Sequence, residues 1–149
     1  MNLFAKLQER AEHGNPIRVG VIGAGKFASM FFAQAQRLAG IHILGIVDLS
    51  PETAMSNLAN VGWPEEMFGA ASIDDAASGG QTHIGDDWQG LVSHPEVEIV
   101  IECTGDPVAA VEHCLGCFAE GKHVINVTVE ADAFCGTGLA QKAQEAGVI

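Results

Sequence analysis

Positive charge is scarce in this sequence, which has 7 Lys and Arg against 19 Asp and Glu and a net charge of −12. No Lys or Arg occurs between Arg37 and Lys122. Proteins that bind nucleic acids neutralise phosphates with clustered cations, so the composition argues against a nucleic-acid partner. The same shortage argues against binding to an acidic membrane surface.

Long hydrophobic runs are also missing, and none approaches the ~20 apolar residues that a membrane span needs. Residues 1–16 carry charges at helical spacing and lack the apolar region of a signal peptide. We therefore expect a cytoplasmic protein with no membrane partner. The 149 residues are 48% apolar, which predicts one globular domain with a substantial core.

Cysteine is limited to four residues, of which Cys114 and Cys117 form the pattern Cys-x-x-Cys. A zinc site would need a second ligand pair at matching spacing, and none is evident. Cys114 lies near an apolar helical stripe, so we interpret it as a small packed side chain. We expect no metal in this chain.

Short apolar strands alternate with helices along the chain. We predict main strands at 17–22, 42–47, 98–102 and 122–127 and a minor one near 82–84. Predicted helices occupy 2–12, 24–38, 51–60, 107–120 and 131–146, and Asp86 is expected to cap a further short helix. This alternation predicts an α/β fold with a doubly wound parallel sheet, the Rossmann type of dinucleotide-binding domain.

The predicted domain covers residues 1–149, with 1–16 as an N-terminal helical extension. The last residues, Val148 and Ile149, resemble the start of another strand. We therefore expect this chain to be the N-terminal piece of a longer protein whose substrate domain follows. The exposed sheet edge and the face left for that domain should promote self-association, so we expect a homo-oligomer.

The segment Gly23-Ala24-Gly25-Lys26-Phe27-Ala28 fits the pattern G-x-G-x-x-G/A between a predicted strand and a predicted helix. Gly23 permits the tight turn, and Gly25 lets backbone N–H groups approach a pyrophosphate. Ala28 lets the helix pack closely on the strand. Helix N-termini attract phosphates through free N–H groups and the helix dipole. We expect these six residues to bind a dinucleotide cofactor, with the Lys26 side chain solvated at the rim.

Asp48 follows the second strand and stands 20 residues after Ala28, where a ribose-binding acid is expected. Its carboxylate could accept hydrogen bonds from both adenosine ribose hydroxyls and would repel a 2′-phosphate. Residues 49–60 contain no cation that could hold such a phosphate. We therefore predict NAD as the cofactor, with NADP less favoured. The alternative is that Asp48 only caps the next helix.

Two further polar groups follow the later strands. Thr104 and Gly105 are placed to line the nicotinamide ribose. Glu102 lies in an apolar strand, where burial would raise its pKa. The alternative is that Glu102 only forms a hydrogen bond to a neighbouring loop. A second group at the carboxyl ends of the strands comprises Thr128, Glu130 and Asp132. Lys122 and His123 lie at the opposite, amino end of the predicted strand 122–127. The remaining histidines are interpreted as surface residues: His13, His42, His83, His94 and His113.

Four segments together resemble a known family: IRVGVIGAGKFASM, IVDLSPE, IVIECTGDP and GKHVINVTVEADA. They are similar to the NAD(P)-binding domain of the homoserine dehydrogenase group. The resemblance is strongest to its SAF-domain-containing, 1-deoxyxylulose-5-phosphate reductoisomerase-like branch, whose members use NADPH. The group's Asn-Lys-Ala segment is replaced here by Thr128, Val129 and Glu130. The absence of that lysine argues against homoserine as the substrate.

These features predict the cofactor-binding part of an oxidoreductase that transfers a hydride between a nicotinamide cofactor and a small polar metabolite. The catalytic residues are unknown and are expected partly beyond residue 149, so this piece alone should be inactive. The alternative is a non-catalytic Rossmann module that senses nucleotides or regulates. A sugar dehydrogenase is a weaker third possibility, because no Glu-Lys-Pro follows GKHV.

Overall fold

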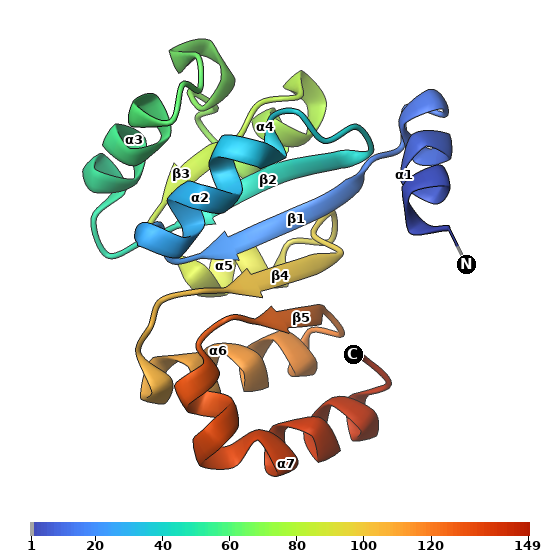
Figure 1. Ribbon diagram of the computed structural model, residues 1–149, viewed down its shortest axis with the longest axis vertical. Helices are drawn as coiled ribbons and strands as arrows, with labels where there is room; N and C mark the ends of the chain where they lie inside the picture. Colours follow the sequence, from blue (N-terminus) through green and yellow to red (C-terminus); the bar gives the residue numbers. More distant parts are fainter. Residues whose placement is uncertain (1) are drawn as a thin grey trace.

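A five-stranded parallel sheet forms the centre of the protein in our computed structural model, which describes residues 2–149 (Figure 1). The strand order is β3-β2-β1-β4-β5. The strands are β1 (Ile17–Ile22), β2 (Ile41–Val47), β3 (His83–Gly85), β4 (Ile99–Glu102) and β5 (His123–Asn126). The chain crosses from β3 at one edge back to β4 beside β1. This reversal makes the carboxyl ends of β1 and β4 the point where ligands bind in such sheets, and it confirms the predicted doubly wound fold.

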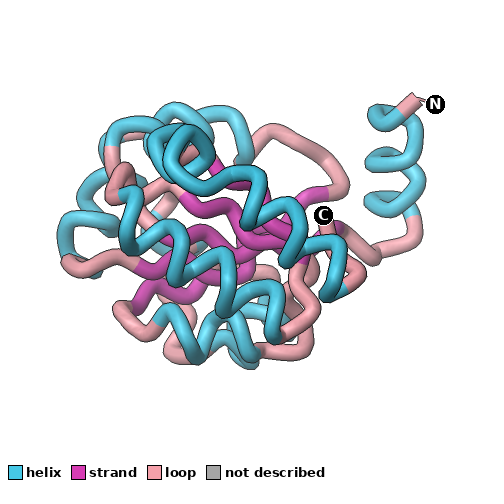
Figure 2. Tube along the Cα trace, turned by 90° about the horizontal axis from the view of Figure 1, so that it is seen from below, coloured by secondary structure: helices cyan, strands magenta, loops and turns pink. Residues whose placement is uncertain are grey.

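Helices cover both faces of the sheet (Figure 2). The helices are α1 (Leu3–Glu12), α2 (Lys26–Ala35), α3 (Pro51–Asn60), α4 (Ile73–Gly79), α5 (Trp88–Ser93), α6 (Pro107–Ala119) and α7 (Val129–Ala146), with a short 3-10 turn η1 (Glu65–Met67). Helices α2 and α3 pack on one face, and α4, α5 and α6 pack on the other. Helix α7 packs beside α6.

The strands alternate their side chains between two apolar clusters. Val21 and Ile46 contact the α2–α3 side, where Phe32 is fully buried. Leu44 and Val100 contact Leu91 of α5 on the other side. This period of two, with both faces buried, is the pattern of a parallel sheet inside an α/β domain.

Side chains cap the starts of α3 and α6 as the sequence predicted, whereas α2 begins at Lys26 and not at residue 24, and α7 begins at Val129 and not at residue 131. The Ser50 side chain accepts a hydrogen bond from the Thr53 amide at 3.3 Å, and Asp106 accepts one from the Val108 amide at 2.9 Å. Helix α5 is capped by Asp87, whose carboxylate accepts from the Gly90 amide at 2.9 Å. The prediction of Asp86 as this cap was therefore wrong by one residue.

Helix α1 corresponds to the predicted N-terminal extension and lies beside the amino ends of β1 and β2 (Figure 1). None of its residues is buried. Arg10 ties it to the body of the domain through an ion pair with Glu98 at 2.9 Å. Within residues 2–149, no helix combines the length and apolar character that crossing a bilayer requires.

Candidate functional site

The loop after β1 contains two glycines in opposite surroundings. Gly23 has a φ of +97°, and a Cβ there would lie 2.9 Å from the backbone carbonyl group of Cys103. Gly25 has a φ of −74° and is exposed, and a Cβ there would meet nothing within 4 Å. Gly23 therefore lets two loops meet, whereas Gly25 leaves open space in front of α2.

The N-terminus of α2 is open to a ligand. Gly25 is its N-cap, and no side chain caps this end. Lys26 and Phe27 in the first turn are exposed, while Ala28 is buried against the sheet. The first amides of a helix have no partner within it, so this end offers free N–H donors and the positive end of the helix dipole.

Asp48 at the end of β2 faces the glycine loop. Its Oδ2 accepts a hydrogen bond from the Ala24 amide at 2.7 Å, and its Oδ1 accepts one from the Ser50 amide at 3.0 Å. Because Ser50 itself caps α3, Asp48 is not the cap of that helix. Each carboxylate oxygen can accept further hydrogen bonds, so donors of a ligand can still bind. Sequence reasoning missed Asn57, whose side-chain amide donates to the Ala24 carbonyl at 2.8 Å.

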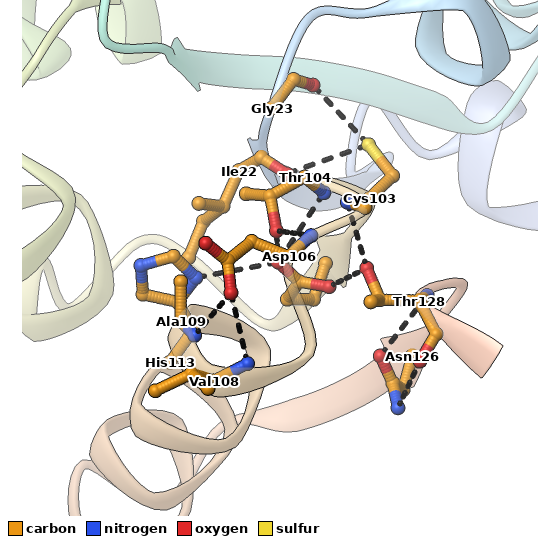
Figure 3. Close-up of polar contacts among 12 residues, drawn as sticks. Ile22, Gly23, Cys103, Thr104, Asp106, Val108, Ala109, His113, Asn126 and Thr128 are labelled. Atoms are coloured by element: carbon orange, nitrogen blue, oxygen red, sulfur yellow. Dashed lines mark hydrogen bonds and ion pairs between the residues drawn. The ribbon is translucent and has the colours of Figure 1, made fainter. Parts of the chain in front are cut away.

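Glu102 is a fully buried carboxylate at the end of β4. The Thr104 hydroxyl donates to its Oε1 at 2.5 Å, and the Thr128 hydroxyl donates to its Oε2 at 2.5 Å. His113 Nδ1 lies 3.3 Å from Oε1. This one carboxylate therefore joins the carboxyl end of β4, the segment after β5, and α6. Figure 3 shows its partners Thr104, His113 and Thr128 close together.

The pKa of Glu102 is set by two opposing effects. Burial raises it, but the hydrogen bonds from His113, Thr104 and Thr128 lower it, and the net pKa lies below the usual value. The expectation of a raised pKa was therefore wrong, because several donors converge on the carboxylate. The group is ionised and acts only as an acceptor.

Thr104 and Gly105 form an exposed turn beside the glycine loop. The Thr104 Cα lies 2.9 Å from where a Cβ on Gly23 would be, so the two loops are in direct contact. Gly105 has a φ of +77°, and its amide donates to the Thr128 hydroxyl at 3.1 Å. The structure thus brings the predicted nicotinamide-side residues next to the predicted phosphate loop.

A cleft of about 180 Å³ opens between the glycine loop and the start of α5. It is lined by Ile22, Gly23, Gly25, Val47, Asp48, Leu49, Asp86, Trp88, Thr104 and His113. The interpretation of His113 as a surface residue was wrong, because its ring is buried between Glu102 and Trp88. Its position nearly two turns after the Asp-Pro start of α6 gave no signal, since the contact with Glu102 is visible only in three dimensions.

The other predicted polar residues lie outside this cleft. Asp132 accepts a hydrogen bond from the Asn126 side chain at 2.9 Å and is exposed, as is Glu130. Lys122 lies at the amino end of β5 as predicted, and its Nζ donates to the carbonyls of His94 and Val97 at 2.9 Å each. These bonds give it a structural role.

The cysteines of the described residues 2–149 are packed side chains and do not form part of a metal site. Cys114 and Cys117 are buried, and burial raises the pKa of each thiol to about 12. The packed role predicted for Cys114 is confirmed. In the part of the chain that the structure describes, no three His, Cys, Asp or Glu side chains are grouped so that they could hold a metal ion.

A parallel sheet with a glycine turn after its first strand and an acid after its second defines a Rossmann-type dinucleotide-binding domain. Residues 19–149 match the family model described as the homoserine dehydrogenase NAD-binding domain. The match covers most of the chain, and the chain belongs to this family. It is a domain of the NAD-binding type that this family describes.

Solved structures share the fold at low sequence identity. A homoserine dehydrogenase from Thiobacillus denitrificans superposes with a TM-score of 0.70 at 22% identity, over 89% of this chain and 28% of that one. The biliverdin reductase of Synechocystis sp. PCC 6803, solved with biliverdin and NADP+, gives 0.62 at 21% identity, over 90% and 36%. A myo-inositol dehydrogenase from Lactobacillus casei, solved with NAD(H) and myo-inositol, gives 0.56 at 15% identity, over 74% and 28%.

The present chain thus spans about a third of the length of these proteins. No curated protein sequence matches it significantly.

Proposed function

We propose that the loop from Gly23 to Ala28 binds the pyrophosphate of NAD and that Asp48 binds its adenosine ribose. The observation that carries this proposal is the contrast between the two glycines. At Gly23, backbone atoms of another loop fill the space that a side chain would need, while Gly25 faces open space at a helix N-terminus that no side chain caps. Phosphate oxygens would accept hydrogen bonds from the free amides there, and the adjacent Asp48 would accept them from ribose hydroxyls.

NAD is favoured over NADP by the charge at the end of β2. Asp48 would repel a 2′-phosphate, and the following segment 49–60 has no cation to offset that repulsion. Lys26 is exposed in the first turn of α2. Thr104 and Gly105, in contact with the glycine loop, would then line the nicotinamide ribose.

The longer protein would be an oxidoreductase in which the nicotinamide supplies the hydride chemistry. We propose that residues 1–149, with 1–16 as a helical extension, form its cofactor domain and that a following domain supplies the substrate site. A small polar metabolite is the proposed substrate. Membership of a dehydrogenase domain family favours this enzyme over the non-catalytic sensing module.

The proposed subfamily is the SAF-domain-containing, reductoisomerase-like branch. Its support is the segment from Thr128 to Asp132, which replaces the lysine-containing segment of homoserine dehydrogenases. Val129 stands at the place of that lysine, and its hydrocarbon side chain cannot substitute chemically for an ammonium group. Homoserine is therefore not the proposed substrate.

We propose that the protein is a cytoplasmic homo-oligomer that binds no nucleic acid, and features of its surface and its thiols support this. Exposed apolar side chains near the ends of β4 and β5 include Val108, Val129 and Phe134, and they would be covered by the substrate domain or in a homo-oligomer. The acidic charge disfavours nucleic acid. All four cysteines are free thiols, which suits the reducing cytoplasm.

Substitution of Asp48 tests the ribose assignment. We expect Asp48→Ala to weaken NADH binding by about 1–3 kcal/mol, because hydrogen bonds to a charged group are lost. Asp48→Asn should narrow the preference for NADH over NADPH by removing the repelling charge. Calorimetric titration of both cofactors measures these changes.

The control is Glu120→Ala, which removes an exposed carboxylate at the far end of α6 and should leave both affinities unchanged. Tighter binding of NADPH than NADH to the unaltered protein would contradict the cofactor assignment.

A further inference from the structure

We propose that His113, held in place by Glu102, accepts a hydrogen bond from the exocyclic amino group of adenine and makes the cleft selective for this base. This inference rests on the proposed function, because it takes Asp48 as the residue that binds the adenosine ribose. It assigns a specificity-determining role to His113 and a positioning role to Glu102.

The cleft has the size and lining of a site for one flat ring system. Its volume of about 180 Å³ is below the ~300–1,000 Å³ typical of pockets that enclose whole ligands. Leu49 is fully exposed at one wall, and Trp88 contributes an aromatic wall. Ile22 and Val47 at the strand ends complete an apolar lining. Such walls suit the faces of a heterocycle and do not suit a phosphate.

The position of Asp48 identifies the heterocycle as adenine. Asp48 lines the same cleft, and the base of a nucleoside is bonded directly to its ribose. A ribose held by Asp48 therefore places its base within the cleft. The nicotinamide end of a dinucleotide lies beyond the pyrophosphate and would be directed toward the carboxyl ends of β4 and β5.

Glu102 determines which ring nitrogen of His113 carries the proton. The ionised carboxylate can only accept, so Nδ1, 3.3 Å from its Oε1, must be the donor. In a neutral imidazole, Nε2 is then an acceptor. Within residues 2–149, Nε2 has no hydrogen-bond partner, yet it is not among the enclosed unpaired atoms, so it is accessible from outside the protein. His113 is one of the residues that line the cleft, and we place Nε2 on that side of the ring. Figure 3 shows one ring nitrogen directed toward the segment after β4 and the other directed away.

Trp88 fixes the plane of the imidazole. The two rings meet edge to face with centroids 4.8 Å apart and an interplanar angle of 64°. Gly116 allows this approach, because a Cβ there would lie 2.7 Å from the indole. Glu102 and Trp88 both contact the His113 ring and favour this orientation, which makes its Nε2 a preorganised acceptor.

A preorganised acceptor discriminates between purines. Adenine carries a donor amino group on its six-membered ring, and unsubstituted purine carries none. Asp86 also lines the cleft, but it is exposed and hydrated, so its interaction with the amino group should contribute little. The preference for adenine should therefore depend on His113 and not on Asp86.

The test compares ADP-ribose with its analogue in which unsubstituted purine replaces adenine, by calorimetric titration. We expect the unaltered protein to bind ADP-ribose about threefold to tenfold more tightly, the usual effect of one net hydrogen bond. His113→Phe, which keeps an aromatic ring against Trp88, should bind both ligands equally. The control Glu120→Ala, which changes an exposed residue outside the cleft, should retain the preference.

Equal binding of both ligands by the unaltered protein, or a preference that survives in His113→Phe, would overturn the inference while leaving the NAD site intact. If ADP-ribose does not bind at all, the proposed function fails, and the inference fails with it. The ligand comparison on the unaltered protein does not depend on the folding of any variant.

The positioning role of Glu102 has a separate spectroscopic signature. Nitrogen chemical shifts of the His113 ring, measured at a pH at which the imidazole is neutral, should show the proton on Nδ1. In Glu102→Gln, the amide no longer imposes this tautomer, so the proton should redistribute toward Nε2 and the adenine preference should fall. A proton on Nε2 in the unaltered protein would contradict the assignment.

Discussion

Gly23→Ala should destabilise the domain by about 2–5 kcal/mol, whereas Gly25→Ala should change its stability by less than about 1 kcal/mol. At Gly23 the φ of +97° disfavours any side chain, and the new Cβ would lie 2.9 Å from the Cys103 carbonyl group and the Thr104 Cα. These atoms belong to the backbone and cannot rotate away. At Gly25 the φ of −74° suits alanine, and the Cβ meets no atom of the protein.

The two variants therefore separate folding from binding. Gly25→Ala should remain folded and lose most of its NADH affinity, because its Cβ would occupy the space proposed for the pyrophosphate. Urea denaturation measures the stability of both variants, and calorimetric titration measures the binding of Gly25→Ala. NADH affinity in Gly25→Ala equal to that of the unaltered protein would contradict the phosphate-loop proposal, and a fully stable Gly23→Ala would contradict the close contact between the two loops.

Much of the fold follows from local sequence signals. The predicted strand at 17–22 and helix at 51–60 match β1 and α3 to the residue. In each segment the spacing of the apolar residues fits one type of secondary structure. Ser50-Pro51 also marks the helix start, because serine caps the helix and proline has a fixed φ. The helix predicted over 24–38 is shorter in the structure, where α2 ends at Ala35. Local signals were weakest at such ends, as with adjacent Asp86 and Asp87, where either carboxylate could cap α5.

The candidate site was only partly predictable, because its motifs are local but its contacts are not. The spacing from Ala28 to Asp48 predicted that the glycine loop and Asp48 both lie at the carboxyl ends of the strands. In the structure, the Asp48 carboxylate accepts a hydrogen bond from the glycine loop. Asn57 reaches that loop from 33 residues away. His113 contacts Glu102 only because α6 folds back along β4. Neither partner follows from residue type or spacing, since each depends on how helices pack.

Glu102→Leu should destabilise the domain at neutral pH by about 3–5 kcal/mol, an effect comparable to breaking a buried ion pair. The leucine leaves the Thr128 hydroxyl and His113 Nδ1 without the acceptor that they have now. Unpaired buried donors carry the full cost of desolvation. Glu112→Leu, which replaces an exposed glutamate of α6, is the matched control and should change stability little. Urea denaturation of the three proteins at about pH 7 provides the comparison.

The same carboxylate should make stability depend on acid. The pKa of Glu102 is lower in the folded protein than its usual value, so the unfolded chain binds the proton more readily. Its stabilising contribution is complete above the unfolded pKa and is lost as the pH falls through the folded pKa. As the pH falls below the usual pKa of a glutamate, the unaltered protein should therefore lose more stability than Glu102→Gln, which has no proton to bind at this position. Parallel acid-dependence curves for the two proteins would show that the donors around Glu102 do not favour its ionised form.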